Sequence, residues 1–467
     1  MYQRRKSSVC QVANVGIGGD NPIRIQSMTN TNTNDIAGSV AQIERIVDAG
    51  ADLVRLTAQG TKEALSLKEI EAGIRKDGYN VPLVADIHFN ANVADVAAAI
   101  VEKVRINPGN YVDPGRTFKK LEYNDEEYAA EIEKIRARLV PFLNICKEHH
   151  TAIRIGVNHG SLSDRIMSRY GDTPAGMVES CMEFLRICRS ENFNDVVISI
   201  KASNCVVMVR TMRLLVEKMN EEGMAYPLHL GVTEAGEGED GRIKSAVGIG
   251  ALLCEGIGDT VRVSLSEAPE REIPVARKLV AMIPECAALR ETCRAEVKDD
   301  TIRLSLNETD MESLQLKAAM TVGALLIDGV AHKLEIQNPG FSKEQLVELA
   351  DSILQAARVK FTRTEYISCP GCGRTLYDLE DTIARIKKAV TETARTDKRF
   401  AALKIGIMGC IVNGPGEMAD ADYGYVGAGP GRVSLYKSKV CIEKNIPSEM
   451  AVERLISFIK EDLDGKN

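Results

Sequence analysis

The fold is decided by two β-branched runs and the segment that joins them: Pro-Ile-Arg-Ile-Gln-Ser-Met at 22–28 and Asp-Leu-Val-Arg-Leu-Thr at 52–57. Short runs of this composition predict buried strands. Between the two runs, apolar residues recur at helical spacing up to Gly50, at Ile36, Val40, Ile43, Ile46 and Val47. The segment therefore predicts a strand–helix–strand unit.

The same unit repeats along the first 284 residues. Six further strands are predicted at 83–88, 103–107, 152–158, 195–201, 228–233 and 259–265, and helices include 91–101 and 175–189. Eight strands alternating with helices predict an α/β fold, a (β/α)₈ TIM barrel. A doubly wound sheet also alternates, but no Gly-rich fingerprint follows the first strand.

Two further regions follow the barrel predicted at 1–284. An insert, a partial extra domain, is predicted at 285–362. Strand character is found at 304–306 and 334–336, and helical character at 311–326 and 343–359. A small α+β domain is predicted at 363–467. It has a helical run at 376–393 and strand-like runs at 403–408, 423–426 and 432–436.

Composition narrows the class of protein. The chain has 467 residues, of which 44% are hydrophobic and 27% charged, and no apolar run is long enough to span a bilayer. We therefore expect a cytoplasmic protein with no membrane partner. The net charge is −7, aromatic residues make up 4% and Trp is absent, so we expect no nucleic-acid partner. Any bound anion requires a local cationic pocket.

The strand ends predict such a pocket. Catalytic groups of TIM barrels lie at the C-terminal ends of the strands, and period-2 alternation places residues two apart on one face. The polar residues that meet this pattern are Arg55, Asp86, His88, Arg105, Asn107, Arg154, Asn158, Lys201, Ser203, His229, Arg262 and Ser264. Their five permanent cations exceed what Asp86 and Glu234 can neutralise, so we expect a phosphorylated small substrate.

Three of the twelve cysteines form a separate pattern. Cys369-Pro-Gly-Cys372 precedes a predicted helix, whose N-terminus favours thiolates, and Cys410 follows a predicted strand. Zinc would need a fourth nitrogen or sulfur ligand, which is not evident nearby, and a redox disulfide would need a thioredoxin-like context. A [4Fe–4S] cluster held by three cysteines leaves one iron open. Glu417 lies close enough in sequence to reach that iron, or it is simply a loop residue.

Several long motifs resemble 4-hydroxy-3-methylbut-2-enyl diphosphate synthase, the iron–sulfur enzyme of the non-mevalonate isoprenoid pathway. In the C-terminal region they are Ile-Ser-Cys-Pro-Gly-Cys-Gly-Arg-Thr-Leu-Tyr-Asp-Leu (367–379) and Met-Gly-Cys-Ile-Val-Asn-Gly-Pro-Gly-Glu (408–417). In the barrel they include Val-Arg-Ile-Asn-Pro-Gly-Asn (104–110), Ile-Arg-Ile-Gly-Val-Asn-His-Gly-Ser-Leu (153–162) and His-Leu-Gly-Val-Thr-Glu-Ala-Gly (229–236).

The resemblance implies a two-electron reductive ring opening of 2-C-methyl-D-erythritol 2,4-cyclodiphosphate with loss of a hydroxyl. It assigns Cys369, Cys372, Cys410 and Glu417 to the [4Fe–4S] cluster, with Glu417 displaceable and also a candidate catalytic acid. It assigns barrel residues to the diphosphate: Arg55, Arg105, Arg154, Asn158, Lys201 and His229. The implied electron donor is reduced ferredoxin or flavodoxin, and a homodimer is compatible with it.

Two other functions stay open at this point. The Cys-Ile-Val-Asn-Gly-Pro-Gly stretch also resembles the cluster loop of sulfite and nitrite reductases, although their fourth cysteine is missing here. A non-enzymatic barrel with a structural zinc site is the third hypothesis.

The insert departs from the family pattern. Short members of the family have a brief linker here and long members a large extra domain, whereas this chain has an intermediate length. The segments Leu-Ile-Asp-Gly (326–329) and Leu-Gln-Ala-Ala-Arg (354–358) are similar to the end of the long insert. Whether the site closes within one chain or between two chains, and whether the short insert impairs closure, is left open.

Overall fold

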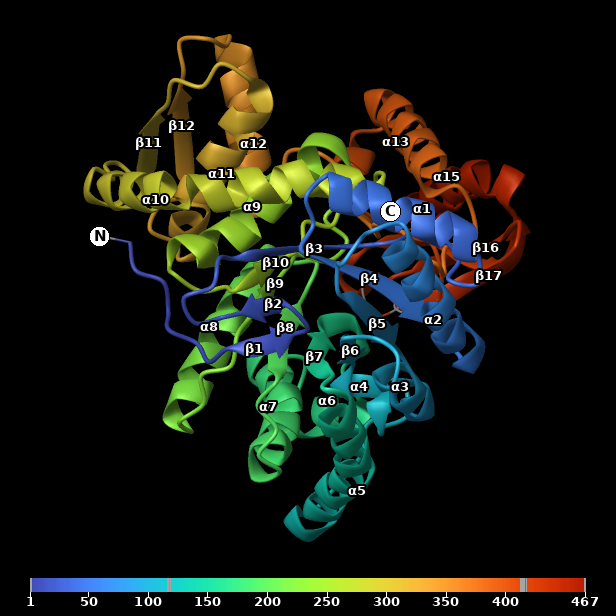
Figure 1. Ribbon diagram of the computed structural model, residues 1–467. Helices are drawn as coiled ribbons and strands as arrows, with labels where there is room; N and C mark the ends of the chain where they lie inside the picture. The colour runs from blue at the N-terminus through green and yellow to red at the C-terminus, as the bar shows by residue number, and fades with distance from the viewer. Residues whose placement is uncertain (1, 116, 118, 412–415, 417, 466–467) are drawn as a thin grey trace.

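Eight parallel strands form the centre of the structure, a computed structural model that describes residues 2–115, 117, 119–411, 416 and 418–465 (Figure 1). Their order is β8-β7-β6-β5-β4-β3-β10-β9, and a parallel bridge between Ile198 and Leu228 joins the two ends. This confirms the predicted barrel. The strands are β3 (Arg24–Met28), β4 (Leu53–Ala58), β5 (Leu83–Ile87), β6 (Lys103–Ile106), β7 (Ala152–Asn158), β8 (Val196–Lys201), β9 (His229–Leu230) and β10 (Thr260–Val261).

Helices surround the barrel and cover its apolar outer face. Polar side chains begin several of them; for example, the Asp35 carboxylate accepts a hydrogen bond from the Gly38 N–H at 3.1 Å. The helices are α1 (Ile36–Asp48), α2 (Thr61–Lys76), α3 (Ala91–Ala98), α4 (Pro108–Tyr111), α5 (Asp125–His149), α6 (Asp164–Tyr170), α7 (Pro174–Ser190), α8 (Cys205–Glu221), α9 (Gly238–Cys254) and α10 (Glu272–Ala295).

The last two barrel strands are shorter than the predicted 228–233 and 259–265. After Leu230 and Val261 the chain leaves the regular ladder, and Thr233 and Arg262 line a cavity instead. The opposite end of the barrel is closed by the hairpin β1 (Cys10–Val12) and β2 (Val15–Ile17). The hairpin packs on an apolar layer of the barrel interior made of Leu53, Val84, Ala152 and Val197.

The insert forms two further strand–helix units beside the barrel: β11 (Thr301–Ser305), α11 (Met311–Ile327), β12 (Lys333–Gln337) and α12 (Lys343–Ala356). Helix α11 lies against α9, and small residues allow the close approach. A Cβ atom at Gly250 would lie 2.5 Å from Met320 Cγ, and one at Gly323 would lie 3.0 Å from the Val247 carbonyl oxygen. The insert is thus anchored on the barrel.

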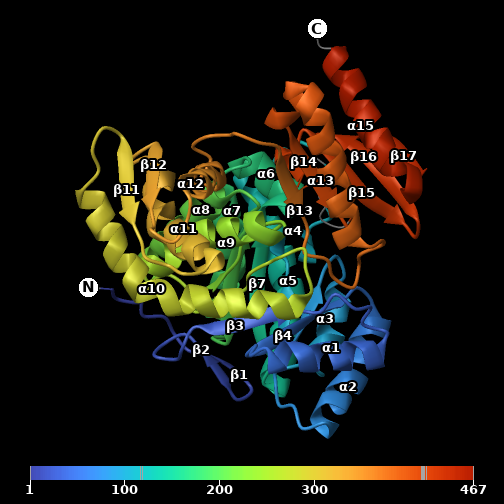
Figure 2. The same ribbon diagram turned by 90° about the horizontal axis from the view of Figure 1, so that it is seen from above.

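The C-terminal region is a five-stranded sheet with two helices. The strands β13 (Glu365–Ser368), β14 (Lys404–Met408), β15 (Tyr423–Gly429), β16 (Arg432–Lys437) and β17 (Val440–Pro447) are adjacent in that order. Helices α13 (Leu379–Thr396) and α15 (Ser448–Asp464) share an apolar core with this sheet. Figures 1 and 2 show this region and the insert on different sides of the barrel.

The C-terminal sheet docks on the barrel of the same chain. Ser368 forms a parallel bridge with Ala235, and the Ser266 hydroxyl donates a hydrogen bond to the Cys369 carbonyl oxygen at 2.8 Å. Lys387 Nζ lies 3.0 Å from a Glu237 carboxylate oxygen. The two halves of the site predicted from sequence therefore meet within one chain, despite the short insert.

A buried ion cluster joins all three regions, and we call Lys244, Arg358 and Glu365 the three-part junction. Lys244 on α9 lies 2.9 Å from one Glu365 oxygen, and Arg358, just after α12, pairs with the other oxygen. The Glu365 side chain is 3% exposed. The barrel, the insert and the C-terminal sheet each contribute one charge. Within the described residues, no helix has the length and apolarity to span a bilayer.

Candidate active site

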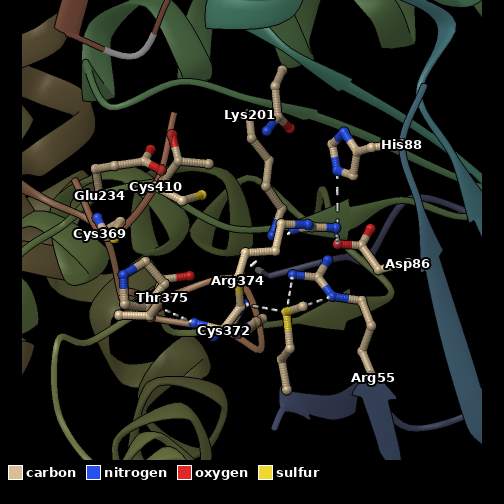
Figure 3. A pocket seen from close by; sticks show the side chains of 18 of the residues that line it. Arg55, Asp86, His88, Lys201, Glu234, Cys369, Cys372, Arg374, Thr375 and Cys410 are labelled. Carbon is tan, nitrogen blue, oxygen red and sulfur yellow. Dashed lines mark hydrogen bonds and ion pairs between the residues drawn. The ribbon is translucent and has the colours of Figure 1, made fainter. Parts of the chain in front are cut away.

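One cavity lies between the C-terminal ends of the barrel strands and the loops that carry the cysteines (Figure 3). About 800 Å³ of space between protein atoms lies here, part of it open to solvent. Predicted residues that line it are Arg55, Asp86, His88, Arg105, Arg154, Asn158, Lys201, Arg262, Ser264, Cys369, Cys372 and Cys410. The structure therefore brings together the cationic strand ends and the three cysteines.

Four other predicted residues are not part of the described lining. Asn107 caps α4, since its side chain accepts a hydrogen bond from the Gly109 N–H at 3.1 Å and donates one to Ser161 at 2.8 Å. His229 is fully buried in the barrel, with Nδ1 3.4 Å from the Thr260 hydroxyl. Ser203 is buried after β8. Glu417 lies outside the described residues.

Three cations of the cavity have protein partners. Arg262 pairs with Glu272 through two contacts of 3.0 and 3.1 Å. Arg105 donates to Asp86 at 2.9 Å and to the Gly156 carbonyl oxygen at 2.9 Å. Arg55 contacts the Met28 sulfur at 2.8 Å. Burial opposes ionisation of Asp86, but Arg55 and Arg105 hold the pKa of Asp86 well below its usual value.

Arg154 and Lys201 differ from these three. Arg154 is 1% exposed and donates one hydrogen bond to Ser199 at 2.8 Å, while its Nε and Nη2 have no partner in the described part of the chain. Lys201 is 4% exposed and has no acidic partner among the described residues. Burial and the nearby Arg154 lower the pKa of Lys201 well below its usual value. Both side chains are placed to receive an anion.

Two glycines provide room for the cations. A Cβ atom at Gly156 would lie 2.5 Å from Arg105 Nε, and one at Gly231 would lie 2.6 Å from Lys201 Nζ. A Cβ atom essentially never makes a contact this short, so a side chain at either position would displace the cation. The glycines therefore help to define where positive charge lies at the C-terminal ends of the barrel strands, which we call the barrel mouth.

The cysteines line the opposite wall of the cavity. Cys369 and Cys372 lie on the loop after β13, and Cys410 lies after β14. The Gly409 N–H donates to the Cys369 sulfur at 3.2 Å. Burial raises the pKa of the free Cys369 thiol to about 12. A bound metal displaces such a proton and favours the thiolate.

The helix after the cysteine loop begins later than predicted. Helix α13 begins at Leu379 rather than at 376, and Asp378 caps it by accepting a hydrogen bond from the Asp381 N–H at 3.0 Å. The donors that contact the two cysteine sulfurs in the described part of the chain are the Gly409 N–H, to Cys369, and Arg374, with Nη1 3.7 Å from the Cys372 sulfur.

The donor chemistry of this wall fits an iron–sulfur group. Three soft thiol donors from two loops face one cavity, and a backbone N–H already donates to one sulfur, as is common around such clusters. In the described part of the chain, no three His, Cys, Asp or Glu side chains are placed to hold a single metal ion. The residues that would hold an iron–sulfur group are Cys369, Cys372 and Cys410.

Two charged residues of the cavity lining were not predicted as site residues. Arg374 lies between Cys372 and Asp86, and Glu234 lies on the cysteine side (Figure 3). Glu234 follows a predicted strand, so its position at a strand end was a usable signal. It also has a φ of +49°, which is unusual for a residue with a side chain and is often associated with functional sites. Arg374 lies in the motif 367–379, two residues after Cys372, so its position there was also a usable signal.

Two family models match the chain. A GcpE TIM-barrel domain matches residues 7–277, and a GcpE protein C-terminal domain matches residues 365–461. The two matches contain the two walls of the cavity.

Curated relatives match over nearly the whole chain. A 4-hydroxy-3-methylbut-2-en-1-yl diphosphate synthase (flavodoxin) from Phocaeicola vulgatus is 52% identical, covering 99% of this chain and 98% of the relative. Proteins of the same name from Porphyromonas gingivalis and Akkermansia muciniphila are 45% and 40% identical. These cover 100% and 98% of this chain and 99% and 97% of the relatives.

The alignment with the Phocaeicola protein extends over 612 positions, more than the 467 residues of this chain. The relative therefore has sequence with no counterpart here. The two family models leave residues 278–364 of this chain unmatched, and the shortened insert inferred from sequence stays a prediction. Full-length identity at this level favours the synthase over the sulfite-reductase and zinc-barrel hypotheses. The cationic barrel mouth, the three cysteines and these matches together show that the chain belongs to the GcpE family of 4-hydroxy-3-methylbut-2-en-1-yl diphosphate synthases.

Proposed function

We propose that this oxidoreductase converts 2-C-methyl-D-erythritol 2,4-cyclodiphosphate into 4-hydroxy-3-methylbut-2-enyl diphosphate, a step of isoprenoid biosynthesis. The observation that carries the proposal is the single cavity whose walls are a cationic barrel mouth and a three-cysteine loop pair of the same chain. The cations suit a diphosphate, and the cysteines suit an electron-transferring iron–sulfur group.

The reaction is balanced by electrons and protons from outside the substrate. A ring C–O bond breaks, which opens the cyclodiphosphate, and a hydroxyl group leaves as water. Counted on the neutral acids, two electrons and two protons enter for each substrate. The relatives' names specify flavodoxin, so we propose reduced flavodoxin as the electron donor.

The cofactor in this proposal is a [4Fe–4S] cluster. Cys369, Cys372 and Cys410 would hold three of its irons, and Glu417 is the proposed ligand of the fourth. When bound, the cluster supplies the two electrons of the reduction.

The barrel holds the diphosphate in this scheme. Arg154 and Lys201 contribute unpaired donors, and Arg55 and Arg105 add positive charge beside them. Removing water from the cavity strengthens these contacts. Arg262, Asn158 and Ser264 also line the barrel side of the cavity.

Glu234 is the carboxyl group that we propose to deliver a proton to the departing hydroxyl. It lines the cavity on the cysteine side and is 6% exposed. A buried carboxyl near the reacting atoms suits general acid catalysis. Glu417 remains the second candidate for this role.

The three regions have separate proposed tasks. Residues 1–284 bind the diphosphate, 363–467 carry the cluster, and 285–362 tie the two together through α11 and α12. Helix α10 runs through residue 284, so the barrel and the insert are continuous.

The proposal is tested on protein prepared without oxygen. We expect about four irons per chain and consumption of the cyclodiphosphate with reduced flavodoxin. Cys410→Ala should lose both, whereas Cys441→Ala, a cysteine on β17 outside the cavity lining, should keep both. Zinc in place of iron, or turnover that persists in Cys410→Ala, would contradict the proposal.

A further inference from the structure

Arg374 reaches the cavity from the cysteine wall. It follows Cys372 by two positions, is 8% exposed, and lines the same cavity as the barrel cations. Its Nη1 lies 3.7 Å from the Cys372 sulfur and its Nη2 lies 3.4 Å from the Asp86 carboxylate (Figure 3). It is therefore the one described permanent cation of the lining that does not come from the barrel.

The backbone is shaped to bring Arg374 to this place. A Cβ atom at Gly373 would lie 2.6 Å from the Thr57 hydroxyl and 2.7 Å from the Thr31 carbonyl oxygen. Gly371 has a φ of +76°, which residues with side chains rarely adopt. The loop can approach the ends of the barrel strands this closely only because both positions are glycine.

The present partners of Arg374 leave donor capacity unused. Asp86 is bound more tightly by Arg105, at 2.9 Å, than by Arg374, at 3.4 Å. The Nε of Arg374 is buried and has no partner in the part of the chain that the structure describes. A buried guanidinium with an unused donor is stabilised when an anion takes that position.

We propose that Arg374 is a substrate-binding residue that contacts the diphosphate from the cysteine side, opposite Arg154 and Lys201. This inference rests on the proposed function, because it takes the diphosphate as the anion of the cavity. In this arrangement Asp86 holds Arg374 in position before substrate binds. Because Arg374 also lies beside Cys372, it keeps the anion next to the cysteine wall.

The test measures binding of inorganic pyrophosphate by calorimetry to the anaerobic, iron-loaded full chain. Loss of a charge-assisted hydrogen bond predicts that Arg374→Gln weakens binding by about 10- to 100-fold. Arg374→Lys should weaken it by about 5- to 10-fold, because a single ammonium cannot reproduce the guanidinium fork. The matched control is Arg363→Gln, an arginine 47% exposed that pairs with Asp240 and should bind pyrophosphate like the wild type.

Iron content is measured on the same samples, since a merely structural role would change it. Wild-type iron with weakened pyrophosphate binding supports the proposal. Wild-type affinity in either folded, iron-loaded variant overturns it while leaving the proposed function intact. If the wild-type chain itself neither binds pyrophosphate nor consumes the cyclodiphosphate, the proposed function fails, and this inference fails with it.

Discussion

The barrel mouth and the three-part junction both bury cations, but they pair them differently. At the junction, Lys244 and Arg358 share the carboxylate of Glu365. At the mouth, Arg154 and Lys201 have no carboxylate partner in the described part of the chain. Burying an unpaired charge costs free energy, whereas a paired one is tolerated. The pairing of buried charges, more than their number, therefore separates a structural cluster from a binding site.

The largest change in the free energy of unfolding is expected from breaking the ion pairs at the three-part junction. Glu365→Gln leaves two buried cations without a carboxylate, which should lower the free energy of unfolding by about 3–5 kcal/mol. Chemical denaturation measures this change. The matched control is Glu335→Gln, which removes an exposed ion pair with Arg303 at 3.0 Å and should cost less than about 1 kcal/mol.

This effect should depend on pH. Burial opposes ionisation of Glu365, but Lys244 and Arg358 lower its pKa below the usual value. The ionised Glu365 side chain therefore contributes its full share of the free energy of unfolding above the ordinary glutamate pKa. This share is lost as the pH falls through the lowered pKa of the folded chain. The gap between wild type and Glu365→Gln should shrink in acid. A gap that stays constant from neutral pH to acid would contradict the assignment.

Removing an unpaired cation at the mouth should have the opposite effect on stability. Arg154→Met should raise the thermal midpoint, because it removes a buried charge without an acidic partner. The same substitution should lower kcat/KM by about 100-fold, because contacts with the bound anion are lost. Lys103→Met is the control. Lys103 is fully buried in the barrel and contacts Gln26 at 3.3 Å, but it does not line the cavity. It should keep wild-type turnover; equal losses in both variants would contradict the distinction.

A smaller change moves a cation without removing it. Gly231→Ala places a methyl group 2.6 Å from the present position of Lys201 Nζ, so Lys201 must shift, and kcat/KM should fall by about 10-fold. Gly429→Ala, at a position with no neighbour within 4 Å of the new Cβ, is the matched control and should behave like the wild type. Steady-state kinetics with the cyclodiphosphate distinguish the two.

The smallest effect on stability is expected from replacing Lys103, which lies deep in the barrel. Burial lowers the pKa of Lys103 to about 7, so between that pH and the ordinary lysine pKa the unfolded chain binds a proton that the folded chain lacks. Wild-type stability should therefore rise with pH across this window. Lys103→Met should be more stable than the wild type near pH 7, and this difference should shrink as the pH rises toward the ordinary lysine pKa. Thermal unfolding at several pH values checks this, and a gain independent of pH would contradict it.

Much of the fold could be predicted because strands and helices have different periods. The eight barrel strands, and the two strands and two helices of the insert, all occur close to their predicted positions. The last barrel strands could not be delimited, because their ends leave the ladder to line the cavity. The start of α13 was also misplaced, because the apolar pattern begins before the Asp378 cap.

The sequence by itself determined which residues face the barrel interior and which cysteines share a loop. Alternation along a strand and spacing along a turn are local properties of the chain. Only the tertiary structure decided which buried cations are paired, that Arg374 joins them, and that the cysteines of the same chain cover the mouth. Those outcomes depend on contacts between residues far apart in sequence, such as Asp86 with Arg374 and Lys244 with Glu365, and no local pattern encodes such contacts.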